Sequence, residues 1–153
     1  MSRFSLNLLW VFIFCLFFRG EVRSECNFVT VTDVNFGYYD VLSGLNNDST
    51  GSIMVFCDAH TYVTTSIGAS PNSGGFNPRQ MIQGSGTDLL NYNLYRNSAR
   101  TEIWGDGTQG TYTLYDRVNR NHTSNWTVYG RIPPGQNVGI GTFGEVLVVT
   151  INF

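Results

Sequence analysis

The last nine residues of the chain place the strongest constraint on its fold. Residues 145–153 read E-V-L-V-V-T-I-N-F, with a two-residue alternation typical of a β-strand. The two faces of that strand carry, in turn, Leu147, Val149, Ile151 and Phe153, and then Val146, Val148, Thr150 and Asn152. A strand with one apolar face and a half-apolar reverse must be central in a sheet, buried in a sandwich, or completed by another chain. We therefore expect a β fold that covers this segment.

The rest of the chain also reads as strands and turns. Stretches rich in β-branched and aromatic residues are separated by clusters of Asn, Gly, Asp, Ser and Pro, and two of these clusters, at residues 46–51 and 71–75, are predicted turns. The stretches are residues 28–36, 52–57, 62–68, 89–95, 111–115 and 126–132, with a shorter stretch at 102–104 that an Asp106-Gly107 hairpin signal joins to 111–115. No stretch keeps a helical period for three turns. The sequence thus predicts a single all-β antiparallel sandwich or barrel over residues 25–153.

The first 24 residues predict a signal peptide that is cleaved after Ser24. Arg3 gives a short basic start, residues 6–18 are apolar apart from Asn7, and V-R-S at 22–24 precedes the expected cut. A membrane anchor is the alternative, but a span needs about 20 apolar residues and this run is shorter. Cleavage removes three of the nine basic and one of the eleven acidic residues, which leaves a formal charge of −4. This charge argues against binding to nucleic acid or to an acidic membrane surface.

Two cysteines, Cys26 and Cys57, remain after the predicted cleavage, since Cys15 lies in the signal peptide. One pair in an exported chain most simply forms one disulfide. A metal pair or a redox pair is the alternative, but the close C-x-x-C spacing and nearby histidines are missing. The chain-entropy model gives roughly 3.7 kcal/mol for a loop of this size. We therefore predict a stabilising disulfide.

Catalytic and metal-binding patterns are weak in this sequence, so we predict no enzyme, metal or cofactor. His60 and His122 are the two histidines, and they lack the spacing of metal ligands. There is no G-x-S-x-G and no phosphate-binding glycine loop. Asp106 and Asp116 could face each other as a glycosidase pair or a calcium site, but Asp beside Gly is first a turn residue.

Aromatic residues leave a second class of function open. Trp104, Tyr112 and Trp126 could stack on sugar rings in a stand-alone secreted carbohydrate-binding sandwich. In a sandwich of alternating strands, most such rings are core or cross-strand partners instead. A small secreted hydrolase is a third and weaker alternative.

Several motifs are arranged along the chain in a distinctive order. They are Cys26, N-F-G-Y at 35–38, the strand 53–57, R-Q-M at 79–81, L-N-Y-N-L-Y at 90–95, W-G-D-G at 104–107, V-Y-G-R-I-P at 128–133 with Gln136, and the closing 141–153. In order and spacing they resemble the spore coat protein U family, which includes the pilins of archaic chaperone-usher systems. The resemblance covers essentially the whole predicted exported chain.

This resemblance implies an immunoglobulin-like sandwich that lacks one strand. A periplasmic chaperone fills the gap, and an extension from the next pilin or coat subunit replaces it after passage through an outer-membrane usher. The chain would then be a non-enzymatic structural subunit, secreted through the periplasm to a cell-surface pilus or coat. An added strand supplies backbone hydrogen bonds and alternate side chains that fill pockets. The expected groove edge is Val146, Leu147, Val148, Val149, Thr150, Ile151 and Phe153, with residues 28–36 as the candidate for the other edge.

Two departures from the family pattern stand out. Polymer-forming members carry an apolar, alternating stretch before the first cysteine, whereas cleavage after Ser24 leaves only Glu25 ahead of Cys26. The chain is therefore expected to accept a strand without donating one, as a terminal subunit does. The second departure is Gly144-Glu145, where the family has an acidic residue beside a hydroxyl residue, so the turn into the last strand is expected to differ.

Overall fold

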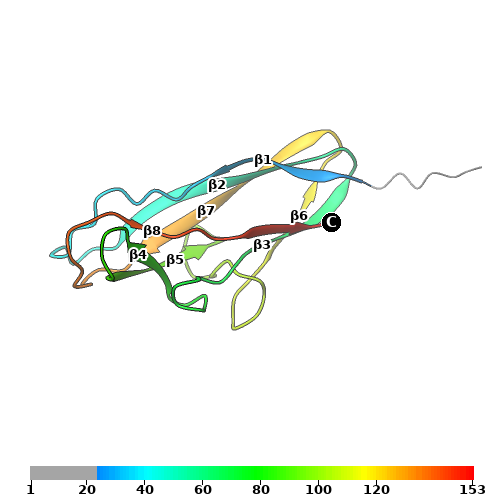
Figure 1. Cartoon of the computed structure of the whole chain (residues 1–153). Coiled ribbons are helices and arrows are strands. Elements are labelled where there is room, and N and C mark those ends of the chain that lie inside the picture. Colours follow the sequence, from blue (N-terminus) through cyan, green and yellow to red (C-terminus); the bar gives the residue numbers. More distant parts are fainter. Residues whose placement is uncertain (1–23) are drawn as a thin grey trace, which may run out of the picture.

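The structure is a computed structural model that describes residues 24–153 (Figure 1). The predicted signal peptide, with Cys15, lies outside the described residues except for Ser24. Residues 24–153 form strands, turns and loops, and none of their segments is a helix long and apolar enough to cross a membrane.

Two antiparallel sheets make up the fold, and all their strand pairs are antiparallel. The six-stranded sheet has, in spatial order, β1 (Cys26–Thr32), β2 (Asn47–Cys57), β7 (His122–Ile132), β5 (Leu89–Tyr95), β4 (Arg79–Gln83) and β8 (Phe143–Gly144). The three-stranded sheet has β6 (Leu114–Val118), β3 (Thr61–Ile67) and β9 (Val149–Asn152). The prediction of an all-β antiparallel sandwich is confirmed.

The centre of the sandwich is formed by β2 and β7. Their register runs without interruption from Asn47 opposite Ile132 to Cys57 opposite His122. Alternate residues of both strands point into the space between the sheets, as the period of two requires. Val55 and Ile132, for example, are 0% and 1% exposed. These inward side chains pack against Val63 and Ile67 of β3, which gives the core its two layers.

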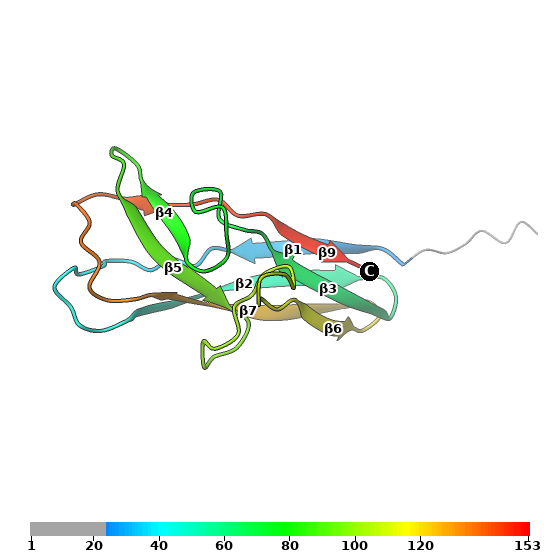
Figure 2. The same ribbon diagram turned by 90° about the horizontal axis from the view of Figure 1, so that it is seen from below.

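One long side of the sandwich is closed and the other is open. On the closed side β6 crosses to β7, and the indole Nε1 of Trp126 donates a hydrogen bond of 2.9 Å to Oδ2 of Asp116. On the open side, β1 and β9 are the outermost strands of different sheets and do not pair with each other. Figure 2 shows β1 and β9 along this same margin, and Figure 1 shows them in different layers of the sandwich. The fold is therefore an open half-barrel.

Three local predictions differ from the structure. The turn expected at residues 46–51 is largely strand, because β2 pairs with β7 from Asn47 onward and this long ladder overrides the turn preference of its polar residues. Strand β4 is absent from the predicted strands; it is short and pairs with β5. The hairpin at Asp106-Gly107 is wrong, because the bridge between Trp104 and Tyr112 is parallel and the loop between them makes several turns.

Candidate functional site

The inward face of β1 is the first wall of the open side. Directly paired residues of an antiparallel ladder have side chains on the same face of the sheet. Phe28 is paired with Val55 and Val31 with Ile53, both of which belong to the core. Yet Phe28 is 38% exposed and Val31 46%, whereas their partners are 0% and 1% exposed. The core-facing side of β1 therefore lacks a cover.

The chain beyond β1 bends over the interior of the six-stranded sheet. Val34 and Phe36 pack against the core there. Two glycines allow this close approach: a Cβ on Gly51 would lie 2.4 Å from the carbonyl oxygen of Thr32, and one on Gly130 would lie 2.7 Å from the Phe36 ring. Residues 31–36 thus continue the wall that β1 begins.

The C-terminal segment is the second wall, and the structure separates its predicted residues into two faces. Leu147, Val149 and Ile151 are half-buried against the core, with Val149 paired with Ile67 and Ile151 with Thr65. The other face points to solvent and comprises Val146, Val148 and Thr150, together with Asn152. Phe153 is 56% exposed at the end of the chain. The alternation predicted from the sequence is therefore present, and its apolar face lines the open side.

A groove runs between these two walls. It has two adjoining parts. The smaller part, of about 260 Å³, lies between the walls, and the larger part, of about 530 Å³, lies beyond them and is lined mainly by residues 33–41 and 138–143. Five residues line both parts: Asp33, Val34, Phe36, Met81 and Phe143. The smaller part reaches down to five core residues, Ile53, Ile67, Tyr92, Leu94 and Val128, and is flanked by Val31, Leu147 and Val149. Residues of the core thus form the floor of the groove, although each of them is itself buried.

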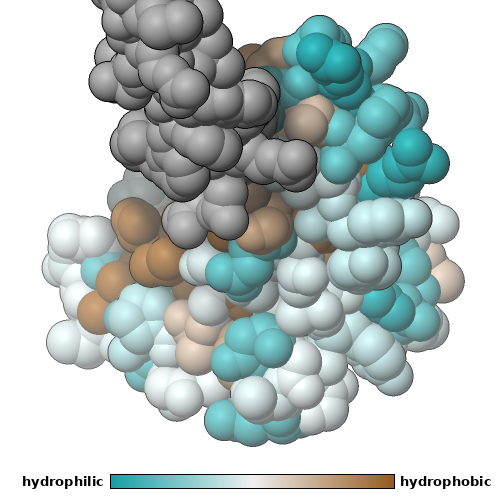
Figure 3. All heavy atoms as spheres, turned by 90° about the vertical axis from the view of Figure 1, so that its right-hand side faces the viewer, coloured by the Kyte–Doolittle hydropathy of each residue, from teal (hydrophilic) through white to brown (hydrophobic). Residues whose placement is uncertain are grey.

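The strands that flank the groove have free edges. Because β1 and β9 are each the last strand of a sheet, each has one row of backbone N–H and C=O groups without a ladder partner among residues 24–153. Figure 3 looks onto the end of the molecule where β1 begins and β9 ends, and hydrophobic residues gather in one part of its visible face. An extended segment placed in the groove would meet apolar walls and unpaired strand edges together.

The disulfide fixes the first wall at one end. Cys26 and Cys57 are bonded, with their Cα atoms 4.2 Å apart, so the prediction of this pair is confirmed. They are directly opposite each other, at the first residue of β1 and the last of β2. The bond therefore ties an edge strand to the central ladder.

Glu145 places a carboxylate on the second wall of the groove. Glu145 is half-buried, and its Oε2 accepts a hydrogen bond of 2.6 Å from the Tyr92 hydroxyl. Burial raises the pKa of Tyr92 strongly, and the hydrogen bond to Glu145 raises it further. The phenol is therefore a permanent donor at physiological pH, and the pair forms a fixed polar point in an apolar wall.

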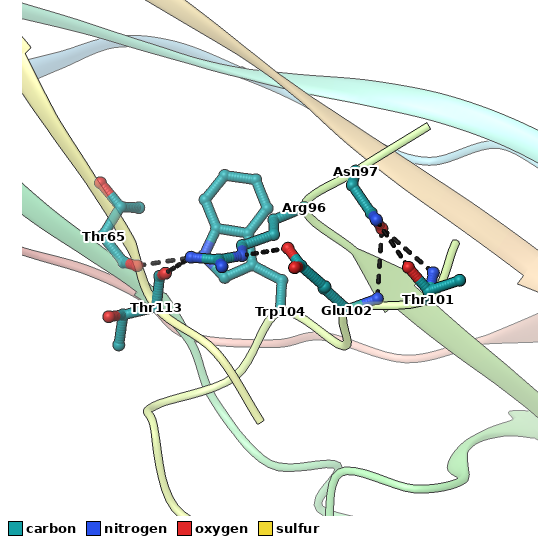
Figure 4. A network of polar contacts seen from close by, with 7 residues as sticks. All are labelled: Thr65, Arg96, Asn97, Thr101, Glu102, Trp104 and Thr113. Carbon is teal, nitrogen blue, oxygen red and sulfur yellow. Dashed lines mark hydrogen bonds and ion pairs between the residues drawn. The ribbon is translucent and has the colours of Figure 1, made fainter. Parts of the chain in front are cut away.

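The residues considered for sugar stacking lie elsewhere. Trp104 is 0% exposed, and its Nε1 donates a hydrogen bond of 3.0 Å to the carbonyl oxygen of Thr65 inside the sandwich (Figure 4). Trp126 is 6% exposed, so neither indole can serve as a stacking platform. Tyr112 is exposed, and the Arg96 guanidinium lies over its ring, with 4.7 Å between the guanidinium carbon Cζ and the ring centroid. The stacking hypothesis is wrong for both tryptophans.

The acidic residues considered for catalysis have structural partners. Asp106 accepts hydrogen bonds from the backbone N–H and hydroxyl of Thr108, and Asp116 accepts one from Trp126. The bonds from Thr108 lower the pKa of Asp106. Among residues 24–153, no three His, Cys, Asp or Glu side chains are placed to hold a metal ion.

Sequence reasoning missed part of the groove. Val34 and Phe36 lie within the predicted edge, but Met81, Val138 and Phe143 were not expected there. A signal for Phe143 existed: the inward period of Ile151, Val149 and Leu147 continues backward through Glu145 to residue 143. Val138 lies in an irregular loop, where no period marks the buried side.

Comparison with known proteins supports a single assignment. The family model described as "Spore Coat Protein U domain" matches residues 14–150. Protein U of Myxococcus xanthus is 34% identical over 130 residues, which cover 78% of this chain and 71% of that protein.

A solved structure has a similar fold. It is one chain of the CsuC–CsuE chaperone–tip adhesion subunit pre-assembly complex, from the archaic chaperone-usher Csu pili of Acinetobacter baumannii. The TM-score is 0.62 at 21% identity, and the match covers 86% of this chain. The chain spans only 40% of that larger chain, so the likeness is one of fold.

Proposed function

Because this chain belongs to the spore coat protein U family, we propose that it is a structural subunit of a surface pilus or coat and that its groove accepts a strand from another chain. The observation that carries the proposal is a groove whose floor is made of core residues, with free strand edges on both sides and the inward face of β1 left uncovered. An extended segment there would supply backbone hydrogen bonds and apolar side chains in one step.

During assembly, different partner chains would occupy the groove one after another. A chain of similar fold occurs in a complex that is described as a chaperone with a tip adhesion subunit before assembly. We propose that a periplasmic chaperone first supplies the strand, that an outer-membrane usher receives the complex, and that a neighbouring pilin or coat subunit then replaces the chaperone. The disulfide fits an extracytoplasmic location, because such bonds persist in oxidising compartments.

The chain's own place in the assembly depends on the cleavage site. Cleavage after Ser24 leaves Glu25 as the one residue before Cys26. We propose that the exported chain then accepts a strand and donates none, as expected of a terminal subunit. The mass of the exported protein's N-terminal peptide tests this proposal: a start at Glu25 supports it, and a start ten or more residues earlier contradicts it.

Charge substitutions within β9 test the groove itself. Val149→Asp places a carboxylate on the groove face, whereas the matched control Thr150→Asp places the same group on the solvent face of the adjacent residue. Co-expression with a periplasmic chaperone encoded beside the chain, followed by affinity purification, should recover the complex with Thr150→Asp but not with Val149→Asp. Equal recovery of both variants would contradict the proposal, as would a soluble, stable exported chain that binds no chaperone.

A further inference from the structure

The groove wall between β8 and β9 has little support from its backbone. Strand β8 has two residues, and residues 145–148 that follow it belong to no strand. Within the described part of the chain, their backbone makes a single hydrogen bond, in which the Gly68 amide donates to the carbonyl oxygen of Val148 at 2.8 Å. Something other than ladder pairing must hold this stretch of the wall in place.

The side chain of Glu145 supplies that support. The hydroxyl of Ser70 and the amide of Asn72, at 3.2 Å, donate to its Oε1, and the hydroxyl of Tyr92 donates to its Oε2. Ser70 is 1% exposed, and its oxygen also accepts from the backbone amide of Gln80 at 3.2 Å. One carboxylate thus ties the wall both to the loop between β3 and β4 and to β5.

A buried arginine supports the same region from within. Arg79 is 0% exposed, and its NH2 donates to the carbonyl oxygens of Gly68 at 3.0 Å and Trp104 at 2.8 Å. Arg79 therefore fixes Gly68, the residue whose amide holds Val148. Burial lowers the pKa of the guanidinium, while the negative charge of Glu145 opposes that shift. Glu145 thus also compensates a buried positive charge.

We propose that Glu145 is the positioning residue that keeps the groove open for an incoming strand; this inference rests on the strand-accepting function proposed above. Two apolar walls in water gain free energy by closing on each other. The wall of residues 143–149 cannot move inward without breaking charge-assisted hydrogen bonds, which are about twice as strong as neutral ones. Glu145 therefore preorganises the site, and preorganisation favours binding by reducing its ordering cost.

The test compares Glu145→Gln, which keeps size but removes charge, with Glu145→Ala and Tyr92→Phe. Val55→Ala is the matched control, since Val55 is a buried core residue that lines neither part of the groove and makes no hydrogen bond to Glu145 through its side chain. Two quantities are measured on the exported chain, freshly refolded at low micromolar concentration. The first is hydrogen exchange at the Gly68 amide. The second is the rate of capture, and of release, of a 13-residue peptide with Val and Ile alternating with Thr and Ser.

The expected result separates positioning from stability. Loss of a charge-assisted bond should raise Gly68 exchange and slow capture by about tenfold in Glu145→Gln, more in Glu145→Ala and less in Tyr92→Phe. Release should change by less than about twofold, because the bound strand itself then holds the wall through its backbone hydrogen bonds. Val55→Ala should lower the midpoint of denaturation without slowing capture.

Three outcomes would overturn the inference. If Glu145→Ala leaves Gly68 exchange and capture unchanged, Glu145 positions nothing. If it slows capture no more than Val55→Ala does, its role is general stability. If the wild-type chain captures neither the peptide nor a chaperone while Gly68 exchange still responds, the proposed function itself fails and Glu145 is a structural anchor only.

Discussion

The central ladder and the open margin of this molecule are built from the same kind of sequence and differ in what covers them. In β2, Ile53 and Val55 alternate with half-buried residues and are 1% and 0% exposed. In β1, Phe28 and Val31 face the same interior and remain 38% and 46% exposed. The alternation of apolar residues along a strand indicates which face of the sheet each side chain lies on. Burial depends on whether a second layer is present.

The contrast also explains why the margin is not an ordinary sheet edge. Soluble proteins protect edge strands with charges, bulges or covering loops. Here a bulge between Phe28 and Thr30 shifts the register of β1, but the strand has no charged residue. The second edge, β9, has none either. The two strands of the margin thus have the uncharged, apolar character of interior strands, but no third strand lies between them among the described residues.

The largest effect is expected in the closed interior. Trp104→Ala removes a fully buried indole and its hydrogen bond to Thr65. We expect a loss of about 3 to 5 kcal/mol in the free energy of unfolding, measured by urea denaturation of the chain with a strand bound. A loss below about 1 kcal/mol would mean that this region is not tightly packed.

Removal of the disulfide should follow closely. Cys26→Ala together with Cys57→Ala releases a cross-link with a sequence separation of 31 and should cost about 2 to 5 kcal/mol. Because the bond ties β1 to the ladder, the amide protons of β1 should lose more protection from exchange than those of β7. Equal loss in both strands would show that the bond stabilises the fold as a whole rather than the margin.

A matched pair of valines compares the two regions most closely. Val55→Ala and Val31→Ala delete the same two methyl groups, the first in the central ladder and the second in the open margin. When no partner strand is bound, Val55→Ala should lower the free energy of unfolding by about 2 kcal/mol and Val31→Ala by less than about 1 kcal/mol. The difference arises because the stabilisation from an apolar side chain is proportional to the apolar area that it buries. With a strand bound, the cost of Val31→Ala should rise toward that of Val55→Ala. An unchanged cost would mean that the strand does not cover β1.

The smallest effect is expected on the outer surface. Arg131 binds Asp48 through two bonds of 2.7 and 2.8 Å, and this contact lowers the pKa of Asp48. Because the pKa of Asp48 is lower in the folded state than in the unfolded state, the contact stabilises the fold fully at a pH above the unfolded-state pKa, which is near 3.9. This stabilisation is lost as the pH falls through the folded-state pKa of Asp48. Both side chains are about a third exposed, so Asp48→Asn should cost at most about 1 kcal/mol at pH 7. If Asp48→Asn still lowered the free energy of unfolding at pH 2, the loss would come from an interaction other than the ion pair with Arg131.

Much of the fold was predictable from the sequence because local rules determine it. Strand β5 was predicted with its observed bounds, and the face of Val149 and Ile151 followed from the period alone. The turn expected near Asn47 was wrong because long-range pairing with β7 outweighs the preference of polar residues for turns. Pairing between distant segments leaves no local mark in either of them.

The site was predictable in part, for a related reason. The apolar alternation identified one wall, and the resemblance to the family suggested the other. The role of Glu145 was not visible, because its partners Ser70 and Asn72 are 75 and 73 residues away in sequence. A buried polar network depends on three-dimensional proximity, so single-sequence reasoning recovers its members only by chance.

The structure of the exported chain bound to its chaperone would test the central claim most directly. The account predicts an extended partner segment in the groove, hydrogen-bonded to the free edge of β1 or β9, with alternate side chains against Ile53, Leu94 and Val128. It also predicts that Phe28 and Val31 become buried. A partner bound elsewhere, or a groove left empty in a stable complex, would contradict it.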